Sequence, residues 1–582
     1  MINPFRDKIV KDPWNPGKAD VQEINADAFD LCCKTLETVR TAGQSTSVLL
    51  YGEAGNGKTH LLGRVREHLE KVPELHIFIS VRLQTSPRMF WQHVRKSFAE
   101  SLTRNTGNNK SQLELICLNR LPCEPHLEKR KYIPVPMFLE RLEQKTGLLQ
   151  RLEKLIERLS HKQTSSPEVW KSLAAQANIS PNLCKALERY LTEHHRQEAV
   201  AWLKGDSLPE SALSRLNLAS DNNDKEYQSR EIVKELCRLA GSEIPVVLCF
   251  DQIEALQRYP GDIEGVFVFG QAVRTLHDET DNVLMISCLQ SYFQVELGKV
   301  VTAPDYAALA AHEKTLNSFS YEQSVKLVQA RLEVCGKLSE EKKEELGPAF
   351  EKELQEFIKP EGQTARQILE YCANLFDLWE TGESEPEISD DDFLNEQITK
   401  REKQAIQNIT PGNTDGIIRS ALPILANLTD ENWKEHYIDL PRDVDMVLKG
   451  SEMRLEISLC NEDKMQTLTS RFKRLLDKSK EDETGNLIIM RHPELKISSG
   501  SSKGRECFEK LKKQKNVRVI YPDNQILAAL DAMQSLIADA RSGDLSSGGK
   551  NISADKVREW LKNHLAVSAQ NFLDEIMGMQ GG

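Results

Sequence analysis

Apolar runs alternate with amphipathic helical segments along the first part of the chain. Four runs of apolar and β-branched residues predict buried strands at residues 48–51, 75–83, 244–251 and 282–288. Helical periodicity is found at residues 21–39, from residue 60 onward and around residues 266–277. Strands that alternate with helices are typical of a parallel sheet covered by helices. The pattern therefore predicts an α/β fold here.

A glycine-rich segment joins the first predicted strand to the next helix. It has the pattern G-x-x-x-x-G-K-[ST], in which glycines let backbone N–H groups surround phosphate oxygens at a helix N-terminus. Lys58 would bring a positive charge to the β- and γ-phosphates, and the Thr59 hydroxyl can ligate Mg²⁺. The predicted phosphate site comprises Gly52, Glu53, Ala54, Gly55, Asn56, Gly57, Lys58, Thr59 and His60. The segment predicts that the chain binds ATP with Mg²⁺.

The predicted strand at residues 244–251 ends in Asp251, where P-loop ATPases present a carboxylate to Mg²⁺. A glutamate that polarises the attacking water usually follows, but this chain has Gln252. An amide cannot take up a proton, so hydrolysis should be slow unless Glu254 substitutes. Glu254 can come near the phosphates only if the chain turns directly after the strand.

Three further segments carry candidate nucleotide contacts. Gln290 follows the strand at residues 282–288, at the position of a polar sensor of the γ-phosphate. Residues 315–332 predict an amphipathic helix after a polar cap, and residues 362–369 open another helix with Arg366 in its first turn. Ile24 and Asn25 are candidates for contact with the base, or else only cap the helix that follows.

The order of these motifs is a P-loop, a D-Q-I-E strand, the strand at residues 282–288, a helical lid and G-Q-T-A-R-Q-I-L. It resembles AAA+ or STAND-type ATPases of the origin-recognition and bacterial-defence kind, over residues 1 to about 380. The resemblance implies that Arg366 reads the nucleotide and couples it to subunit geometry in a homo-oligomer. It leaves the arginine finger open between Arg274 and Arg331.

Residues 87–237 are almost wholly helical in pattern, with heptad-like spacing at residues 138–159. The helix–break–helix at residues 170–194 allows helix-turn-helix DNA binding. Because the segment carries acids as freely as bases, we favour an insertion that contacts neighbouring subunits or partners.

The C-terminal part has the element order α-β-β-α-β-α-β, with Asp445 and Glu456 on paired strands. This resembles the restriction-endonuclease-like fold, whose two carboxylates hold a divalent metal while a lysine activates water. Ser458 stands at the position of that lysine. Either the domain is a degenerate, non-cleaving binding module, or Lys464 of the next helix reaches the metal; a chance placement of the two acids is the third alternative.

The predicted fold is thus a P-loop parallel-sheet ATPase core with a long helical insertion and a helical lid, followed by a smaller restriction-endonuclease-like α/β domain. The expected boundaries are ATPase core at 1–98 and 239–310, helical insertion at 99–238, helical lid at 311–380, linker at 381–410, endonuclease-like domain at 411–541, and linker with a C-terminal helix at 542–582. That last amphipathic helix carries Val557, Trp560, Leu561 and Leu565 and could dock on the body or on a partner.

Charge and composition refine the functional classes. The net charge of −12 argues against a chain that coats nucleic acid everywhere, but residues 451–518 hold 16 Lys and Arg against 11 Asp and Glu. This local excess fits contact with a phosphate backbone, or two ordinary solvated helix faces. No apolar stretch reaches the roughly 18 residues of a membrane span, and no signal sequence is seen. The 12 cysteines form no C-x-x-C pair and indicate a reduced, cytoplasmic protein.

These observations predict an ATP-switched, DNA-associated protein that hydrolyses ATP slowly, engages DNA through its C-terminal domain, and acts in prokaryotic anti-phage defence with a partner protein encoded nearby. Two alternatives remain. One is an ATP-dependent nuclease that uses Asp445 and Glu456. The other is a loader or scaffold of the origin-recognition or transposition-regulator kind.

Overall fold

The structure is a computed structural model of the chain. It describes residues 3–578 apart from 7–9, 11, 18, 73, 106–109, 121–166, 193–194, 219–223, 336–337, 361, 382–388, 438–439, 452, 463, 483–484, 498–501 and 548–549. The heptad-like spacing expected at residues 138–159 lies outside the described residues. The chain forms two compact units. Unit 1 comprises Met1–Leu83, Met89–Glu254 and Ile263–Glu385, and unit 2 comprises Gln84–Arg88, Ala255–Asp262 and Pro386–Gly582.

Unit 1 is built on a parallel sheet of five strands in the order β2-β3-β4-β1-β5. The strands are β1 (Thr46–Gly52), β2 (Ile77–Arg82), β3 (Val246–Asp251), β4 (Val283–Leu289) and β5 (His312–Leu316). The predicted α/β fold with a parallel sheet is confirmed, and each of the four predicted strands is present. β1 lies between β4 and β5, so the glycine-rich segment leaves the sheet near its centre.

The helix predicted after a polar cap in residues 315–332 is confirmed, and the strand β5 before it was not predicted. β5 pairs with β1, and the helix α15 (Tyr321–Val334) begins later. The reason lies in its N-terminus, because Ser320 and Gln323 form a reciprocal capping box that fixes where the helix can start.

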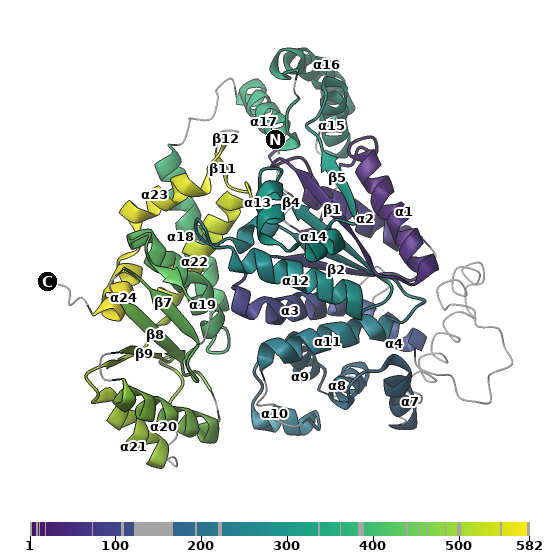
Figure 1. The fold of residues 1–582 in the computed structure, drawn as a ribbon. Coiled ribbons are helices and arrows are strands. Elements are labelled where there is room, and N and C mark those ends of the chain that lie inside the picture. Colours follow the sequence, from purple (N-terminus) through teal and green to yellow (C-terminus); the bar gives the residue numbers. More distant parts are fainter. Residues whose placement is uncertain are drawn as a thin grey trace. The chain divides into compact units, whose positions relative to one another are not determined.

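Helices cover both faces of this sheet (Figure 1). α1 (Ala26–Ala42) and α2 (Lys58–Lys71) bury Leu36 and Leu62 against Val48 and Ile286 of the strands. On the other face, α3 (Phe90–Thr103) packs on β2, and α12 (Glu264–Glu279) places Phe269 against Phe250 of β3 with ring centroids 5.4 Å apart. The sheet is therefore buried on both faces, as the continuous apolar strands require.

Further helices complete unit 1. They are α4 (Gln112–Arg120), α7 (Pro167–Ala177), α8 (Pro181–Leu191), α9 (Arg196–Lys204), α10 (Glu210–Arg215), α11 (Lys225–Ala240), α13 (Phe293–Val300), α14 (Ala303–Leu309), α15, α16 (Glu340–Phe357) and α17 (Ala365–Thr381). α15, α16 and α17 share one apolar core that also buries Phe5 from the start of the chain. These three helices form the expected lid (Figure 1).

Unit 2 contains a mixed sheet in the order β10-β9-β8-β7-β6. The strands are β6 (Lys434–Glu435), β7 (Met446–Lys449), β8 (Arg454–Leu459), β9 (Asn486–Met490) and β10 (Val517–Ile520). β6, β7 and β8 pair antiparallel, whereas β8, β9 and β10 pair parallel. The predicted smaller α/β domain is confirmed, and the short edge strand β6 was not predicted.

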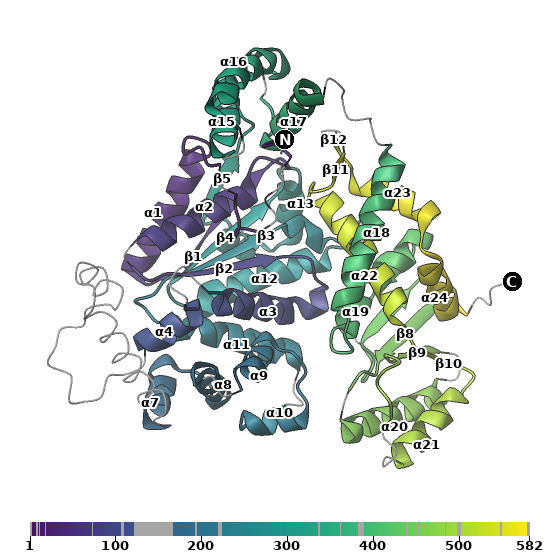
Figure 2. The same ribbon diagram turned by 180° about the vertical axis from the view of Figure 1, so that it is seen from behind.

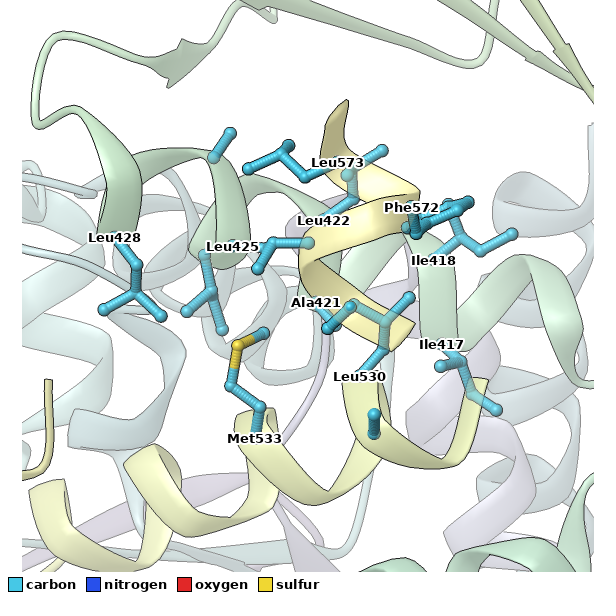
Figure 3. Packing of buried hydrophobic residues seen from close by; sticks show 14 of the residues in the cluster. Ile417, Ile418, Ala421, Leu422, Leu425, Leu428, Leu530, Met533, Phe572 and Leu573 are labelled. Carbon is cyan, nitrogen blue, oxygen red and sulfur yellow. The ribbon is translucent and has the colours of Figure 1, made fainter. Parts of the chain in front are cut away.

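Two apolar cores flank this sheet. α20 (Met465–Glu481) and α21 (Ser502–Lys512) lie side by side on one face (Figure 2), and the rings of Phe472 and Phe508 are stacked. The other face is covered by α18 (Asp390–Asn408), α19 (Thr414–Thr429), α22 (Asn524–Arg541), α23 (Ala554–His564) and α24 (Val567–Met577). Figure 3 shows Leu422, Leu530 and Phe572 meeting within this second core.

Two parts of unit 2 differ from the sequence prediction. Within the range expected as a linker, α18 buries Leu394 and Ala405. The expected single C-terminal helix is a pair, α23 and α24, preceded by a small hairpin of β11 (Ser546–Ser547) and β12 (Lys550–Asn551). Val557 and Trp560 lie in the second core, so α23 docks on its own unit.

Candidate functional site

The P-loop connects the carboxyl end of β1 to the first turn of α2. Gly57 precedes the helix with a φ of 83° and has no side chain to cap it. No acidic residue of α2 lies in its first turn, so the helix itself places no negative charge at its positive end. Lys58 Nζ donates hydrogen bonds to the carbonyls of Gly52, at 2.8 Å, and Glu53, at 3.2 Å. The loop therefore presents N–H groups and an ammonium, which is the chemistry that a phosphate chain requires.

The lid helix α17 begins directly against this loop. Gly55 has a φ of 91°, and a Cβ added there would lie 2.8 Å from Cβ of Arg366 and 3.1 Å from Oγ1 of Thr364. Only glycine permits this approach. Asn56 completes the contact by donating from Nδ2 to the carbonyl of Leu316, 3.0 Å away at the end of β5. The structure thus brings the predicted lid arginine Arg366 to the P-loop.

Residues near the start of the chain contact the P-loop and the helix α17. Asn25, with a φ of 54°, donates from Nδ2 to the carbonyl of Asn56 at 3.0 Å. Ile24 packs against the core of the lid. Asn3 donates to the carbonyl of Ala373 and to Asp377 of α17, both at 2.9 Å. Asn25 therefore contacts the P-loop, and Asn3 and Ile24 contact the lid.

Asp251 lies at the end of β3 and accepts a hydrogen bond from the Thr59 hydroxyl at 2.6 Å. The two residues are far apart in sequence, and the pairing of β3 with β4, and of β4 with β1, brings them together. A hydroxyl and a carboxylate are the hard oxygen ligands that Mg²⁺ takes beside the phosphates of a nucleotide. The residues present therefore fit a magnesium ion.

Gln252 is held in a left-handed backbone conformation with a φ of 63°. Its Oε1 accepts a hydrogen bond of 2.5 Å from Nε of Arg82, the last residue of β2. The role of Arg82 as the partner of Gln252 was not predicted from the sequence. Its position follows from the parallel register of β2 and β3, which pairs Arg82 with Asp251.

The chain turns directly after β3, as Glu254 requires if it is to approach the phosphates. Residues Ile253–Leu256 form one short 3₁₀ turn, and Glu254 is 1% exposed. Gln290 donates to its carboxylate from the backbone N–H at 3.3 Å and from Nε2 at 3.4 Å. Burial raises the pKa of Glu254 to about 7, and the nearby Lys58 charge opposes this rise. Glu254, Lys58 and Gln290 thus belong to one site.

His60, Arg331 and Arg274 are the remaining candidate residues of unit 1. Burial lowers the pKa of His60, whose ring lies 3.9 Å from Asp20, and the charge of Arg331 acts in the same direction. Arg331 therefore lies near the P-loop helix. Arg274 is half exposed on α12 and pairs with Asp278 at 2.5 Å.

The carboxylates predicted for a second metal site in unit 2 are paired with cations. Asp445 receives Arg419 at 2.6 Å and also Arg471, and its Oδ2 accepts the backbone N–H of Leu459. Arg471 also donates to Ser458.

Glu456 pairs with Arg454 at 2.9 Å and Lys478 at 2.8 Å. Lys464 is the N-cap residue of α20. Among the described residues, no group of three or more His, Cys, Asp and Glu side chains is arranged to hold a metal.

No helix among the described residues combines the length and the apolar character that a bilayer crossing demands.

No protein-family model and no curated protein matches this sequence. Among solved structures, the chain is similar to the Orc1 protein of Aeropyrum pernix in complex with DNA, at 13% identity and a TM-score of 0.30. The similarity covers 73% of this chain and 84% of that one. At that TM-score the likeness carries no argument about function.

Proposed function

We propose that this chain is a nucleotide-switched ATPase of the AAA+/STAND kind, which binds ATP with Mg²⁺ in unit 1 and changes its posture with the nucleotide. The observation that supports this most is the convergence of three elements on the P-loop. Thr59 meets Asp251, Lys58 folds over the loop carbonyls, and the lid touches Gly55.

Thr59 and Asp251 would hold the magnesium ion, which when bound would offset negative charge on the phosphates. Lys58 would leave the carbonyls of Gly52 and Glu53 to bind phosphate oxygens. The N-terminus of α2 would bind the same anion through its free N–H groups.

Hydrolysis would be slow, because the residue after Asp251 is Gln252, an amide whose oxygen accepts a hydrogen bond from Arg82. Glu254 is the carboxylate left to take a proton from the attacking water. Its pKa of about 7 lies near the operating pH of a general base, so Glu254 would supply the turnover that remains. Slow turnover suits a latch better than a motor.

The lid would sense the nucleotide through Arg366. A ligand shifts an equilibrium between two postures only by its different affinity for each of them. Because α17 begins against Gly55, ATP in the P-loop would contact core and lid together. The angle of the lid would then control homo-oligomerisation and the engagement of DNA or a partner.

The magnesium site is tested by Thr59→Val, with Thr38→Val on the exposed side of α1 as the matched control. Equilibrium binding of ATP is measured with Mg²⁺ and with EDTA. We expect Mg²⁺ to tighten binding in the wild type and in Thr38→Val, and to have little effect in Thr59→Val. An unchanged effect of Mg²⁺ in Thr59→Val would remove Thr59 from the site.

Unit 2 is proposed as a degenerate endonuclease-like module that binds nucleic acid without cutting it. The pairing of Asp445 with two arginines supports this, because a cation already neutralises the carboxylate that a metal would need. Exposed basic residues gather on and after α20 and α21, among them Lys473, Lys480, Lys503, Arg505, Lys510, Lys512, Lys513 and Lys515. They suit a phosphate backbone.

The nuclease alternative is tested with plasmid DNA, ATP and Mg²⁺ or Mn²⁺. DNA retention without cleavage is the expected result. Nicking that is lost in Glu456→Ala would instead establish the nuclease, and neither retention nor nicking would favour the loader or scaffold.

The proposed setting is the cytoplasm of a prokaryote and defence against phage, with a partner protein encoded nearby. The order of the sequence motifs supports it. Size-exclusion chromatography with and without ATP, followed by identification of co-purified proteins, tests the oligomer and the partner.

A further inference from the structure

Two segments that leave the carboxyl ends of neighbouring strands of unit 1 belong to unit 2. Gln84–Arg88 follows β2, and Ala255–Asp262 follows β3 and Glu254. β2 and β3 carry Arg82 and Asp251, which are paired in register at the proposed nucleotide site. The chain therefore passes from the end of each strand into a segment that belongs to unit 2.

Each segment brings one arginine to the same carboxylate. Nε of Arg88 donates to Oε1 of Glu435 at 3.0 Å, and Nη1 of Arg258 donates to Oε2 at 2.9 Å. The side chains of Glu435 and Arg258 are 1% and 2% exposed. One buried carboxylate on the edge strand β6 thus receives both segments.

Additional groups fix this arrangement, which we call the Glu435 clamp (Arg88, Arg258, Asp262, Glu435 and Tyr437). Asp262 accepts from Nε of Arg258 at 2.8 Å, and the Tyr437 hydroxyl bonds to Arg258 and Glu435. Two arginines and two carboxylates balance in charge. A buried charge that loses its partner is strongly destabilising, so the clamp holds the two segments firmly.

The clamp also reaches the carboxylate pair of unit 2. Nη1 of Arg258 donates to the carbonyl of Arg419 at 3.3 Å, and the side chain of Arg419 pairs with Asp445. Arg258 is four residues from Glu254 in the chain. The end of β3 is therefore connected to the environment of Asp445 through Arg258 and Arg419.

We propose that the Glu435 clamp transmits the nucleotide state of unit 1 to unit 2, through movement of the chain that follows Gln252 and Glu254. This inference rests on the proposed function, since it requires a nucleotide at the P-loop. Spatial continuity alone does not establish coupling, so the test measures the coupling itself.

The experiment is hydrogen–deuterium exchange of the full chain with and without Mg²⁺ and the slowly hydrolysed analogue ATPγS. The variants are Glu435→Gln, which removes the shared charge, and the milder Arg88→Gln, whose site is 18% exposed. The control is Asp443→Asn. Asp443 is a carboxylate of unit 2 that is 12% exposed and paired with Arg474 of α20. Neither strand-end segment takes part in this pair.

In the wild type and in Asp443→Asn, we expect ATPγS to change exchange in peptides from residues 419–437. In Glu435→Gln and Arg88→Gln, ATPγS should still bind, with a Kd within about threefold of the wild type, while that change is at least halved. A full change in folded Arg88→Gln and Glu435→Gln would overturn the proposal, as would no change in the wild type despite binding. Failure of ATPγS to bind the wild type would instead show that the proposed function itself is wrong.

Discussion

At the scale of single residues, Gln252 and Glu254 distinguish the proposed nucleotide site from that of an efficient ATPase. Gln252 cannot act as a base, and Arg82 holds its amide oxygen at 2.5 Å. Glu254 can act as a base, but it is buried and only partly ionised near neutral pH. The amide at Gln252 is therefore the feature that we expect to slow the transfer of a proton from water, and Glu254 is the base that is left.

Gln252→Glu should raise the hydrolysis rate, by about tenfold or more, because general-base catalysis typically contributes two or more orders of magnitude. Phosphate release at saturating ATP measures the effect. Gln271→Glu on the exposed side of α12 adds the same charge away from the site and should leave the rate unchanged. An unaltered rate in Gln252→Glu would show that the amide is not what limits turnover.

The pKa of Glu254 predicts how activity depends on pH. Below about pH 7 the carboxyl is protonated and cannot accept a proton, so kcat/KM for ATP should rise as the pH passes through about 7. In Glu254→Gln the residual activity should be low and lack this rise. A wild-type profile that is flat between pH 6 and 8 would exclude Glu254 as the base.

The residues of the P-loop could be predicted from sequence because their function depends on local spacing. Asp251 could be predicted because it ends an apolar strand. Arg82 could not, since its contact with Gln252 follows from the register between two strands that lie far apart in the chain. The pairing of Asp445 with Arg419 and Arg471 could not be predicted either, because it depends on how the helices α19 and α20 pack.

At the scale of elements, apolar periodicity located the buried strands β1 to β4 and the helices α1, α2 and α12. β5 was missed because its residues are mainly polar and exposed, with only Leu316 buried. α18 was missed because its acidic start resembles a linker, although its aspartates suit a helix N-terminus. Short edge strands and acidic helices give little apolar signal.

The packing of α24 in unit 2 predicts a large stability effect. Phe572 is 1% exposed, so Phe572→Ala should lower the free energy of unfolding by about 3–5 kcal/mol. Val567 begins the same helix but is 74% exposed, and Val567→Ala should change it by less than about 0.5 kcal/mol. Urea unfolding of the two variants compares them directly. Equal effects would mean that α24 does not pack as described.

At the scale of the whole molecule, a chain with a net charge of −12 carries a basic region in unit 2. If that region binds DNA, affinity must fall steeply with salt, because bound counterions are released.

Lys513→Gln with Lys515→Gln should lower the slope of log K against log salt by about 2. Lys400→Gln with Lys403→Gln, on the exposed side of α18, is the matched control and should leave the slope unchanged. Fluorescence anisotropy with a labelled duplex at several salt concentrations gives the slopes. Equal slopes in both variants would place the DNA contact elsewhere.

The central claim is that a triphosphate bound at Lys58 controls the posture of this molecule. Calorimetric titration with ATP and Mg²⁺ tests it on the wild type, on Lys58→Ala, and on Lys71→Ala at the exposed end of the same helix. We predict that Lys58→Ala binds ATP about 100-fold more weakly, while Lys71→Ala binds like the wild type. Binding of Lys58→Ala with the wild-type affinity would contradict the account.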